Sequence, residues 1–206
     1  MDKLDYKKEY KDLYLPKKKP VIVSVPAISF IMAEGEGNPN GENFAYAVGA
    51  LYSLSYAVKM SYKSHSVPDN YYQYTVFPLE GVWDLVDKTL LPTDKNNLKY
   101  NMMIRQPDFL DIDLFDRFLL ETKRKRPNPY LEKVKFGTIS EGICCQMLHI
   151  GSYDEEPVSF EIMDKFCTDN GYRRSSYKHR EIYLSDPGKT EQDKLKTVLR
   201  YQIEHK

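Results

Sequence analysis

The chain has no net charge, few cysteines and no long apolar run. Its 206 residues include 30 basic and 30 acidic side chains, a balance that argues against a dedicated nucleic-acid binder. No apolar run approaches the length of a membrane span, and the N-terminus lacks the apolar core of a signal peptide. We therefore expect a cytoplasmic protein that binds neither nucleic acid nor a membrane directly.

Residue patterns that hold metals, disulfides or dinucleotides are also missing. Cys144, Cys145 and Cys167 are odd in number and two are adjacent in an apolar run, which predicts buried free thiols. The four histidines are His65, His149, His179 and His205. They are scattered, with no metal-ligand pair on a helix, and Gly35-Glu36-Gly37 lacks the third glycine of a dinucleotide fingerprint. The sequence predicts no metal and no cofactor.

Aromatic residues, in contrast, are in surplus: 17 tyrosines, 9 phenylalanines and 1 tryptophan. Tyrosine buries a large ring and keeps a polar tip, which suits a sheet surface and also a pocket for flat, multi-ring ligands. Any single ring is more often core or sheet surface than ligand contact. We favour Trp83, because indole stacks well on flat rings and on cations. The candidate wall residues are Tyr52, Tyr56, Tyr71, Tyr72, Tyr74, Phe77, Trp83, Tyr153, Tyr177 and Tyr183.

Hydrophobic periodicity predicts strands and helices after a charged arm at residues 1–19. Strands are predicted at 21–25 and 29–33, separated by Pro26, and at 72–77, 81–83, 98–105, 137–150, 172–177 and 179–184. Helices are predicted at 44–62, 111–125 and 155–170. Each half then reads strand, glycine-containing loop, helix, strand, strand. This order predicts an α+β fold of two tandem β-α-β-β modules, with an antiparallel sheet, helices on one face and a ligand cleft.

A carboxylate lies in the middle of the last predicted strand. Ile182 and Leu184 point one way, whereas Glu181, Tyr183 and Ser185 point the other way. On a solvated face Glu181 would be ordinary. On a face toward the core or a pocket, its charge needs a partner, and the residue becomes a candidate for cation binding or general acid–base chemistry.

More acids occur where the helix at 155–170 begins, in Asp154-Glu155-Glu156-Pro157. Acids at this position usually complement the helix dipole. The predicted topology can also bring this helix start and the last strand to one cleft, where the proximity of two acids would raise one pKa. One acid could then act as general base toward water, and the other as acid or orienting group.

Six segments carry a family resemblance. They are Leu13–Lys18 followed by Pro20-Val21, Glu34–Asn40, Tyr52–Met60, Tyr74–Trp83, His149–Pro157 and His179–Pro187. With them the chain resembles the long, stand-alone branch of the GyrI-like small-molecule-binding family over nearly its whole length. Shorter relatives are the effector domains of multidrug-sensing transcription regulators.

The resemblance implies a single domain at 20–206 with a ligand cleft along a pseudo-twofold axis. Module one would cover residues 20–105, a connecting helix 108–126 and module two 136–206. The implied ligand is a lipophilic aromatic or cationic small molecule, attracted by an acid deep in an aromatic cleft, and Glu181 resembles that acid. The wall residues that we expect are Tyr52, Tyr56, Tyr74, Phe77, Trp83, Tyr153 and Tyr183.

Some stand-alone members are similar to cyclopropanoid cyclopropyl hydrolases, which open the strained ring of DNA-alkylating compounds by adding water. Two glutamates support that reaction, and by motif they look like Glu156 and Glu181. Glu155 is the alternative to Glu156, because the stretch between Gly171 and Lys178 looks shorter here. Two functions stay open, a hydrolase and a non-catalytic multidrug-binding module for sequestration or signalling. We expect no regulator role, since no DNA-binding segment precedes the domain.

Overall fold

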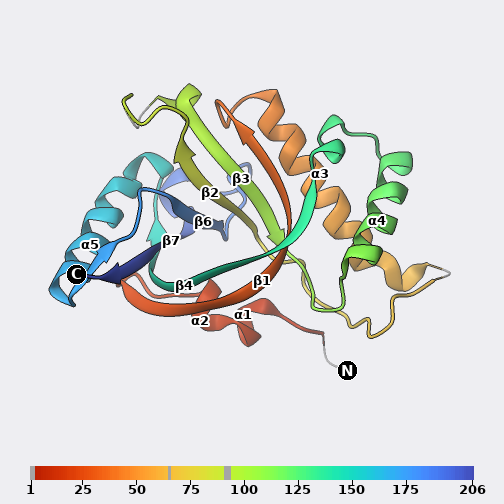
Figure 1. Ribbon diagram of the computed structural model, residues 1–206, viewed down its shortest axis with the longest axis horizontal. Coiled ribbons are helices and arrows are strands. Elements are labelled where there is room, and N and C mark those ends of the chain that lie inside the picture. The colour runs from red at the N-terminus through yellow and green to blue at the C-terminus, as the bar shows by residue number, and fades with distance from the viewer. Residues whose placement is uncertain (1–2, 65, 91–93) are drawn as a thin grey trace. The chain divides into compact units, whose positions relative to one another are not determined.

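The chain folds into two compact units of mixed helix and strand (Figure 1). The computed structural model describes residues 3–64, 66–90 and 94–206, so His65 lies outside the described residues. Unit 1 comprises the described residues of Met1–Tyr6, Ile28–Phe77 and Leu85–Ile139, and unit 2 comprises Lys7–Ala27, Pro78–Asp84 and Ser140–Lys206. The α+β class and the mainly antiparallel pairing confirm the prediction at that level.

Unit 1 is built around one long helix. Its helices are α3 (Glu42–Lys59) and α4 (Ile112–Lys125), with the short 3-10 helices η1 (Met60–Lys63), η2 (Lys95–Asn97) and η3 (Pro129–Glu132). Helix α3 buries Ala47, Leu51, Leu54 and Val58, which recur at helical spacing on one face. It lies beside α4 (Figure 1) and also contacts β3 (Leu98–Arg105). Strand β3 pairs antiparallel with residues 30–36 of β1 (Val21–Glu36).

Unit 2 is organised by its last strand. Its strands are the C-terminal part of β4 (Lys135–Ile150), β2 (Leu79–Leu85), β5 (Tyr172–Arg174), β6 (His179–Tyr183) and β7 (Lys196–His205); its helices are α1 (Tyr6–Glu9), α2 (Lys11–Tyr14), η4 (Tyr153–Glu155), α5 (Glu156–Asp169) and η5 (Gln192–Lys194). Strand β7 pairs antiparallel with β4, β5 and β6, and β6 pairs with β2. Helix α5 buries Met163 and Cys167 against Cys145, Leu199 and Tyr201 of these strands. This core fixes the start of α5 next to β6.

Two expectations about elements were wrong, and one strand was missed. Pro26 does not separate two strands, because proline keeps an extended φ and removes only a donor; β1 continues through it. Residues 72–77 form no strand beyond a bridge from Tyr74 to Leu4, since Tyr72 and Tyr74 pack instead on Phe109. Strand β7 was not predicted, because residues 197–201 are all buried and the period-2 alternation is hidden.

The remaining predicted elements are present within a few residues of their expected bounds. The three cysteines are buried free thiols, as predicted. Among the described residues, no helix combines the length and apolar composition that crossing a membrane requires. The tandem modules and their symmetry stay predictions.

Candidate functional site

Glu181 lies on a buried face of β6. Only 8% of the residue is exposed, so its carboxylate is in the environment where a charge needs a partner. Glu156, the first residue of α5, is 5% exposed. Both acids belong to unit 2, and with His179 they offer ligand atoms that all lie within 4.8 Å of one another. The start of the helix and strand β6 therefore meet in one acid cluster, which we define as Glu156, His179 and Glu181.

The carboxylate of Glu181 accepts hydrogen bonds at both oxygens. The Nε2 atom of His179 lies 3.0 Å from its Oε1, and the hydroxyl of Tyr183 donates to its Oε2 over 2.8 Å. The indole N–H of Trp83 donates in turn to the Tyr183 hydroxyl over 2.8 Å. Residues 179, 181 and 183 alternate along one face of β6, and Trp83 lies opposite His179 on β2. These donors stabilise the ionised form of Glu181.

The buried carboxyl of Glu156 interacts directly with that of Glu181. Burial raises the pKa of Glu156 well above its ordinary value, and the charge of Glu181 and the hydrogen bond to it act in the same direction. Two carboxyl groups this close cannot both ionise easily. The surroundings of Glu156 therefore favour its protonated form beside the Glu181 carboxyl. The Oε1 atom of Glu156 is buried and has no hydrogen-bond partner among the described residues.

Glu155 points its carboxylate into a local turn. Its Oε2 accepts from the Ser152 backbone N–H over 3.2 Å, as part of a capping box. Gly151 has a φ of 141°, and a Cβ on it would lie 2.6 Å from that same oxygen. The structure therefore separates two neighbouring acids, with Glu155 in the cap and Glu156 in the acid cluster.

His149 stabilises the same turn through both nitrogens of its ring. Its Nδ1 lies 2.9 Å from the Ser159 hydroxyl and its Nε2 lies 3.0 Å from the Ser152 carbonyl oxygen. A carbonyl only accepts, so Nε2 donates and Nδ1 accepts from the hydroxyl. His149 is buried and both of its nitrogens are engaged. It connects the end of β4 to the first turn of α5 and so supports the position of Glu156.

Aromatic rings line the acid cluster within unit 2. Tyr153 contacts Tyr183 edge to face, with ring centroids 6.0 Å apart, and burial and the charge of Glu181 raise the pKa of Tyr153 to about 12. Phe160 contacts His179 edge to face at 4.9 Å. Sequence reasoning missed Phe160 and His179, although spacing could have found both. Phe160 lies four residues after Glu156 on a helix, and His179 lies two residues before Glu181 on a strand.

The other expected wall residues belong to unit 1. Tyr52 and Tyr56 contact each other on α3, with centroids 6.4 Å apart, and Tyr56 is 48% exposed. Tyr74 and Phe77 are buried, with centroids 6.5 Å apart. The structure thus brings Trp83, Tyr153 and Tyr183 together with the acids in unit 2. A role for the four unit 1 residues in ligand binding stays a prediction.

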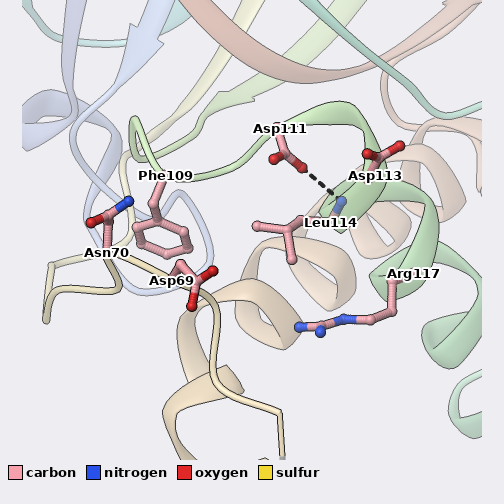
Figure 2. A pocket seen from close by; sticks show the side chains of 7 residues that line it. All are labelled: Asp69, Asn70, Phe109, Asp111, Asp113, Leu114 and Arg117. Carbon is pink, nitrogen blue, oxygen red and sulfur yellow. Dashed lines mark hydrogen bonds between the residues drawn. The ribbon is translucent and has the colours of Figure 1, made fainter.

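Unit 1 has a cavity of its own, of about 520 Å³ (Figure 2). It is lined by Asp69, Asn70, Phe109, Asp111, Asp113, Leu114 and Arg117. Asp111 accepts from the Leu114 backbone N–H over 2.8 Å and caps α4. Helix capping accounts for this acid, and the lining residues contain no nucleophile–base pair.

Two carboxylates and an imidazole could in principle hold a divalent cation. Within the part of the chain that the structure describes, the acid cluster is the group of side chains with that spacing. Both Glu181 oxygens and His179 Nε2 are already engaged in hydrogen bonds of the cluster itself. The absence of a metal stays a prediction.

Comparisons with known proteins agree on one family. The GyrI-like small molecule binding domain matches residues 18–205, whereas no curated protein matches the chain. An uncharacterized conserved protein from Listeria innocua is 36% identical with a TM-score of 0.93, and a protein from the same organism described as a hydrolase is 35% identical with a TM-score of 0.90. Each alignment covers 98% of this chain and 100% of the other. The EcmrR C-terminal domain shares the fold, at 12% identity, a TM-score of 0.57 and coverage of 91% of this chain and 98% of that one.

Proposed function

The chain belongs to the GyrI-like family of small-molecule-binding domains, and we propose that it binds flat, lipophilic, often cationic molecules at the acid cluster and adds water to those that carry a strained cyclopropane. The observation that carries the proposal is the buried carboxyl pair Glu156–Glu181, in which burial and the neighbouring Glu181 raise the pKa of Glu156 well above its ordinary value. A relative of equal length, 35% identical, is described as a hydrolase, which supports an enzyme over a passive binder.

Binding follows from the charge and the rings of the cluster. The cluster buries the carboxylate of Glu181, whose negative charge a ligand can meet. A lipophilic cation compensates that charge without needing water, and this favours it over a neutral ligand of the same shape. Trp83, Tyr183, Tyr153 and Phe160 offer aromatic faces and edges, and each good cation–π contact contributes about 0.5–2 kcal/mol.

Hydrolysis needs one group that accepts a proton and one that donates. In the proposed reaction Glu181 takes a proton from water as its oxygen bonds to a cyclopropane carbon. The ring C–C bond breaks, its electron pair moves into the conjugated ring system of the ligand, and Glu156 donates its proton to the anion that forms. Glu181 then returns its new proton to Glu156 through their hydrogen bond, which restores the pair. General acid and general base each contribute about 10²–10⁴-fold, and the strain of the ring lowers the remaining barrier.

The test compares three single variants, in each of which an amide replaces one carboxyl group. Glu156→Gln and Glu181→Gln keep the shape of each acid, and Glu155→Gln is the matched control in the adjacent cap. Each protein is incubated with a cyclopropane-containing DNA alkylator, and mass spectrometry follows the gain of one water. We expect turnover in the wild type and in Glu155→Gln, and a loss of at least a hundredfold in the other two. Equal turnover in Glu181→Gln, or an unchanged compound with the wild type, contradicts the enzyme.

A second candidate is a non-catalytic binder for sequestration or for signalling to a partner. The favouring observation is that Glu181 accepts from His179 and Tyr183 and shares the Glu156 proton. Hydrogen bonds to both of its oxygens suit a carboxylate that serves as a counter-charge. Titration with rhodamine 6G, a flat lipophilic cation, separates the candidates. A binder loses affinity in Glu181→Gln while no variant, nor the wild type, forms product.

A further inference from the structure

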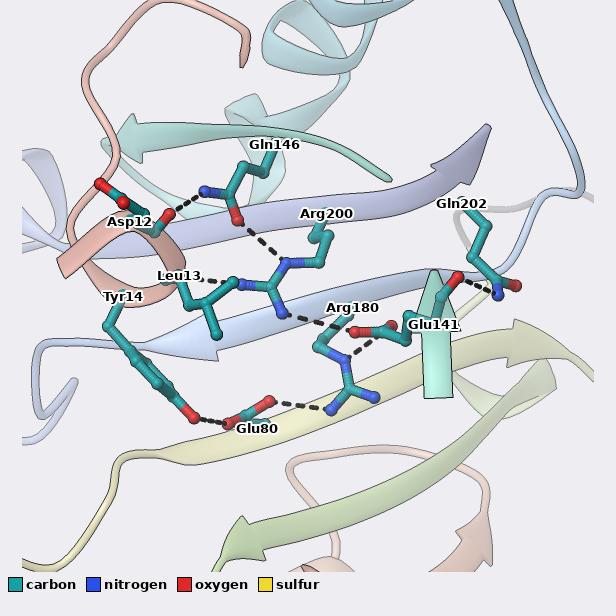
Figure 3. Close-up of polar contacts among 9 residues, drawn as sticks. All are labelled: Asp12, Leu13, Tyr14, Glu80, Glu141, Gln146, Arg180, Arg200 and Gln202. Carbon is teal, nitrogen blue, oxygen red and sulfur yellow. Dashed lines mark hydrogen bonds and ion pairs between the residues drawn. The ribbon is translucent and has the colours of Figure 1, made fainter. Parts of the chain in front are cut away.

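A closed ring of buried polar contacts includes Arg180, which alternates with His179 and Glu181 along β6 and therefore lies on the opposite face of the strand. Figure 3 shows the members of this ring. The Tyr14 hydroxyl donates to Glu80 Oε1 over 3.1 Å, and Arg180 Nη1 donates to Glu80 Oε2 over 2.8 Å. Arg180 Nε donates to Glu141 Oε1 over 2.9 Å, and Arg200 Nη1 donates to Glu141 Oε2 over 3.4 Å. Arg200 Nη2 then donates to the Leu13 carbonyl oxygen over 2.7 Å. The ring thus begins and ends on the dipeptide Leu13-Tyr14.

The ring joins α2 to four of the strands of unit 2. Glu80 comes from β2, Glu141 from β4, Arg180 from β6 and Arg200 from β7. The side chains of Arg180 and Glu80 are each 1% exposed, that of Arg200 is 3% exposed and that of Glu141 is 12% exposed. Arg180 and Arg200 are cross-strand partners, a pairing of like charges that would repel without the carboxylate of Glu141 between them. Two cations and two anions balance, so loss of any one member leaves a buried charge uncompensated.

Residues 12–14 close this ring although they precede residues 18–205, which the GyrI-like domain matches. Gln146 adds a second attachment, because it donates to the Asp12 carbonyl oxygen and accepts from Arg200 Nε over 3.0 Å. The segment therefore supplies a donor to Glu80 and acceptors to Arg200 and Gln146, all of which are buried. We define Asp12–Tyr14 as the N-terminal clasp.

We propose that the N-terminal clasp and Arg180 are positioning residues for Glu181. They hold β6 in place through contacts on the face of the strand opposite Glu181. Arg180 lies between His179 and Glu181 in β6. The side chains of the ring and of the acid cluster therefore project from the same strand toward opposite faces. The side chain of Glu80 crosses from β2 to Arg180 on one face, while Trp83 crosses from β2 to Tyr183 on the other. Both faces of the β2–β6 pair are thereby fixed in one register.

The contact between Glu156 and Glu181 is sensitive to small displacements of β6. A hydrogen bond between two carboxyl groups is short and directional, and a shift of about 1 Å at a reacting group costs on the order of a hundredfold in rate. A loosened β6 would weaken the Glu156–Glu181 contact before it unfolded the unit. The expected effect on turnover rests on the proposed function, whereas the expected effect on the shared proton does not.

The test removes one hydroxyl at each of two buried tyrosines of unit 2. Tyr14→Phe opens the ring at Glu80. Tyr201→Phe is the matched control, because its hydroxyl donates to the Asp164 carboxylate over 2.7 Å outside the ring. The ¹³C resonances of glutamate side-chain carboxyls, followed against pH, report where the acid pair loses its shared proton. Turnover of the cyclopropane alkylator and binding of rhodamine 6G are measured on the same full-length proteins.

We expect Tyr14→Phe to hold the shared proton about tenfold more weakly, so that it is released about one pH unit lower, and to lower kcat about tenfold with KM within a factor of about two. Tyr201→Phe should match the wild type in both. A wild-type carboxyl titration in folded Tyr14→Phe, or the same shift in Tyr201→Phe, would overturn the inference. Gln146→Leu detaches the clasp at its other end and replaces Tyr14→Phe if that variant does not fold. If the wild type forms no product, the enzyme proposal fails while the titration still decides the role of the clasp.

Discussion

The proton on Glu156 makes a quantitative prediction about stability. Glutamate in the unfolded chain has a pKa near 4.5, and the folded-state pKa of Glu156 is raised well above it by burial and by Glu181. Between these two values the folded state binds one more proton than the unfolded state. Stability from this group is therefore fully present below the unfolded pKa and is lost as pH rises through the folded pKa.

The magnitude is about 1.4 kcal/mol of unfolding free energy for each pH unit within that window. Glu156→Gln mimics the protonated acid and cannot ionise, so it lacks this slope. Its amide can also still donate to Glu181. We expect the two proteins to be similar in stability near the unfolded pKa and the variant to become progressively more stable than the wild type above it.

Urea unfolding at a series of pH values measures the difference. Because the groups outside the acid pair are common to both proteins, subtracting the two curves isolates the titration of the coupled Glu156–Glu181 pair, and the pH at which the difference stops growing is the higher pKa of that pair. Parallel curves would mean that Glu156 is ionised in the folded protein. The shared proton, and with it the acid role proposed for Glu156, would then be refuted.

Three further predictions concern the surroundings of the acid cluster. Trp83→Phe removes the donor to Tyr183 and should weaken rhodamine 6G binding about tenfold by fluorescence anisotropy; unchanged affinity would remove Trp83 from the site. Gly151→Ala places a Cβ 2.6 Å from Glu155 Oε2 at a φ of 141°, and in urea unfolding it should destabilise by about 1–3 kcal/mol, with Gly188→Ala as a control of ordinary backbone geometry. The three cysteines are buried, and burial raises the pKa of Cys144 to about 12, so a thiol reagent should label none of them before unfolding and all three afterwards. Rapid labelling of the native protein would contradict this burial.

Strand β6 carries two different polar systems on its two faces. His179, Glu181 and Tyr183 face the candidate ligand site, and Arg180 faces the buried ring. Such a strand tolerates no shift by one residue, because a slip would exchange the two faces. The polar contacts on both faces therefore stabilise β6 as a central strand, although only one of its five residues is aliphatic.

Sequence alone identified what local pattern encodes. The period of apolar residues predicted α3, α4 and α5, and alternation around Glu181 placed that acid with Tyr183 on one face. The family resemblance pointed to Glu156 and Glu181 together. The element predictions succeed because they depend on spacing along one element, which the sequence contains directly.

Tertiary structure decided which polar groups became partners. Sequence left Glu155 and Glu156 as alternatives, and only the turn at Gly151 directs the first into a cap and the second toward Glu181. Arg180 and Arg200 look like ordinary charges in the sequence, yet both are buried among distant partners: Glu80 is 100 positions from Arg180, and the Leu13 carbonyl is 187 positions from Arg200. Local pattern cannot encode such pairs, because the free energy of burying a charge depends on which distant side chain neutralises it.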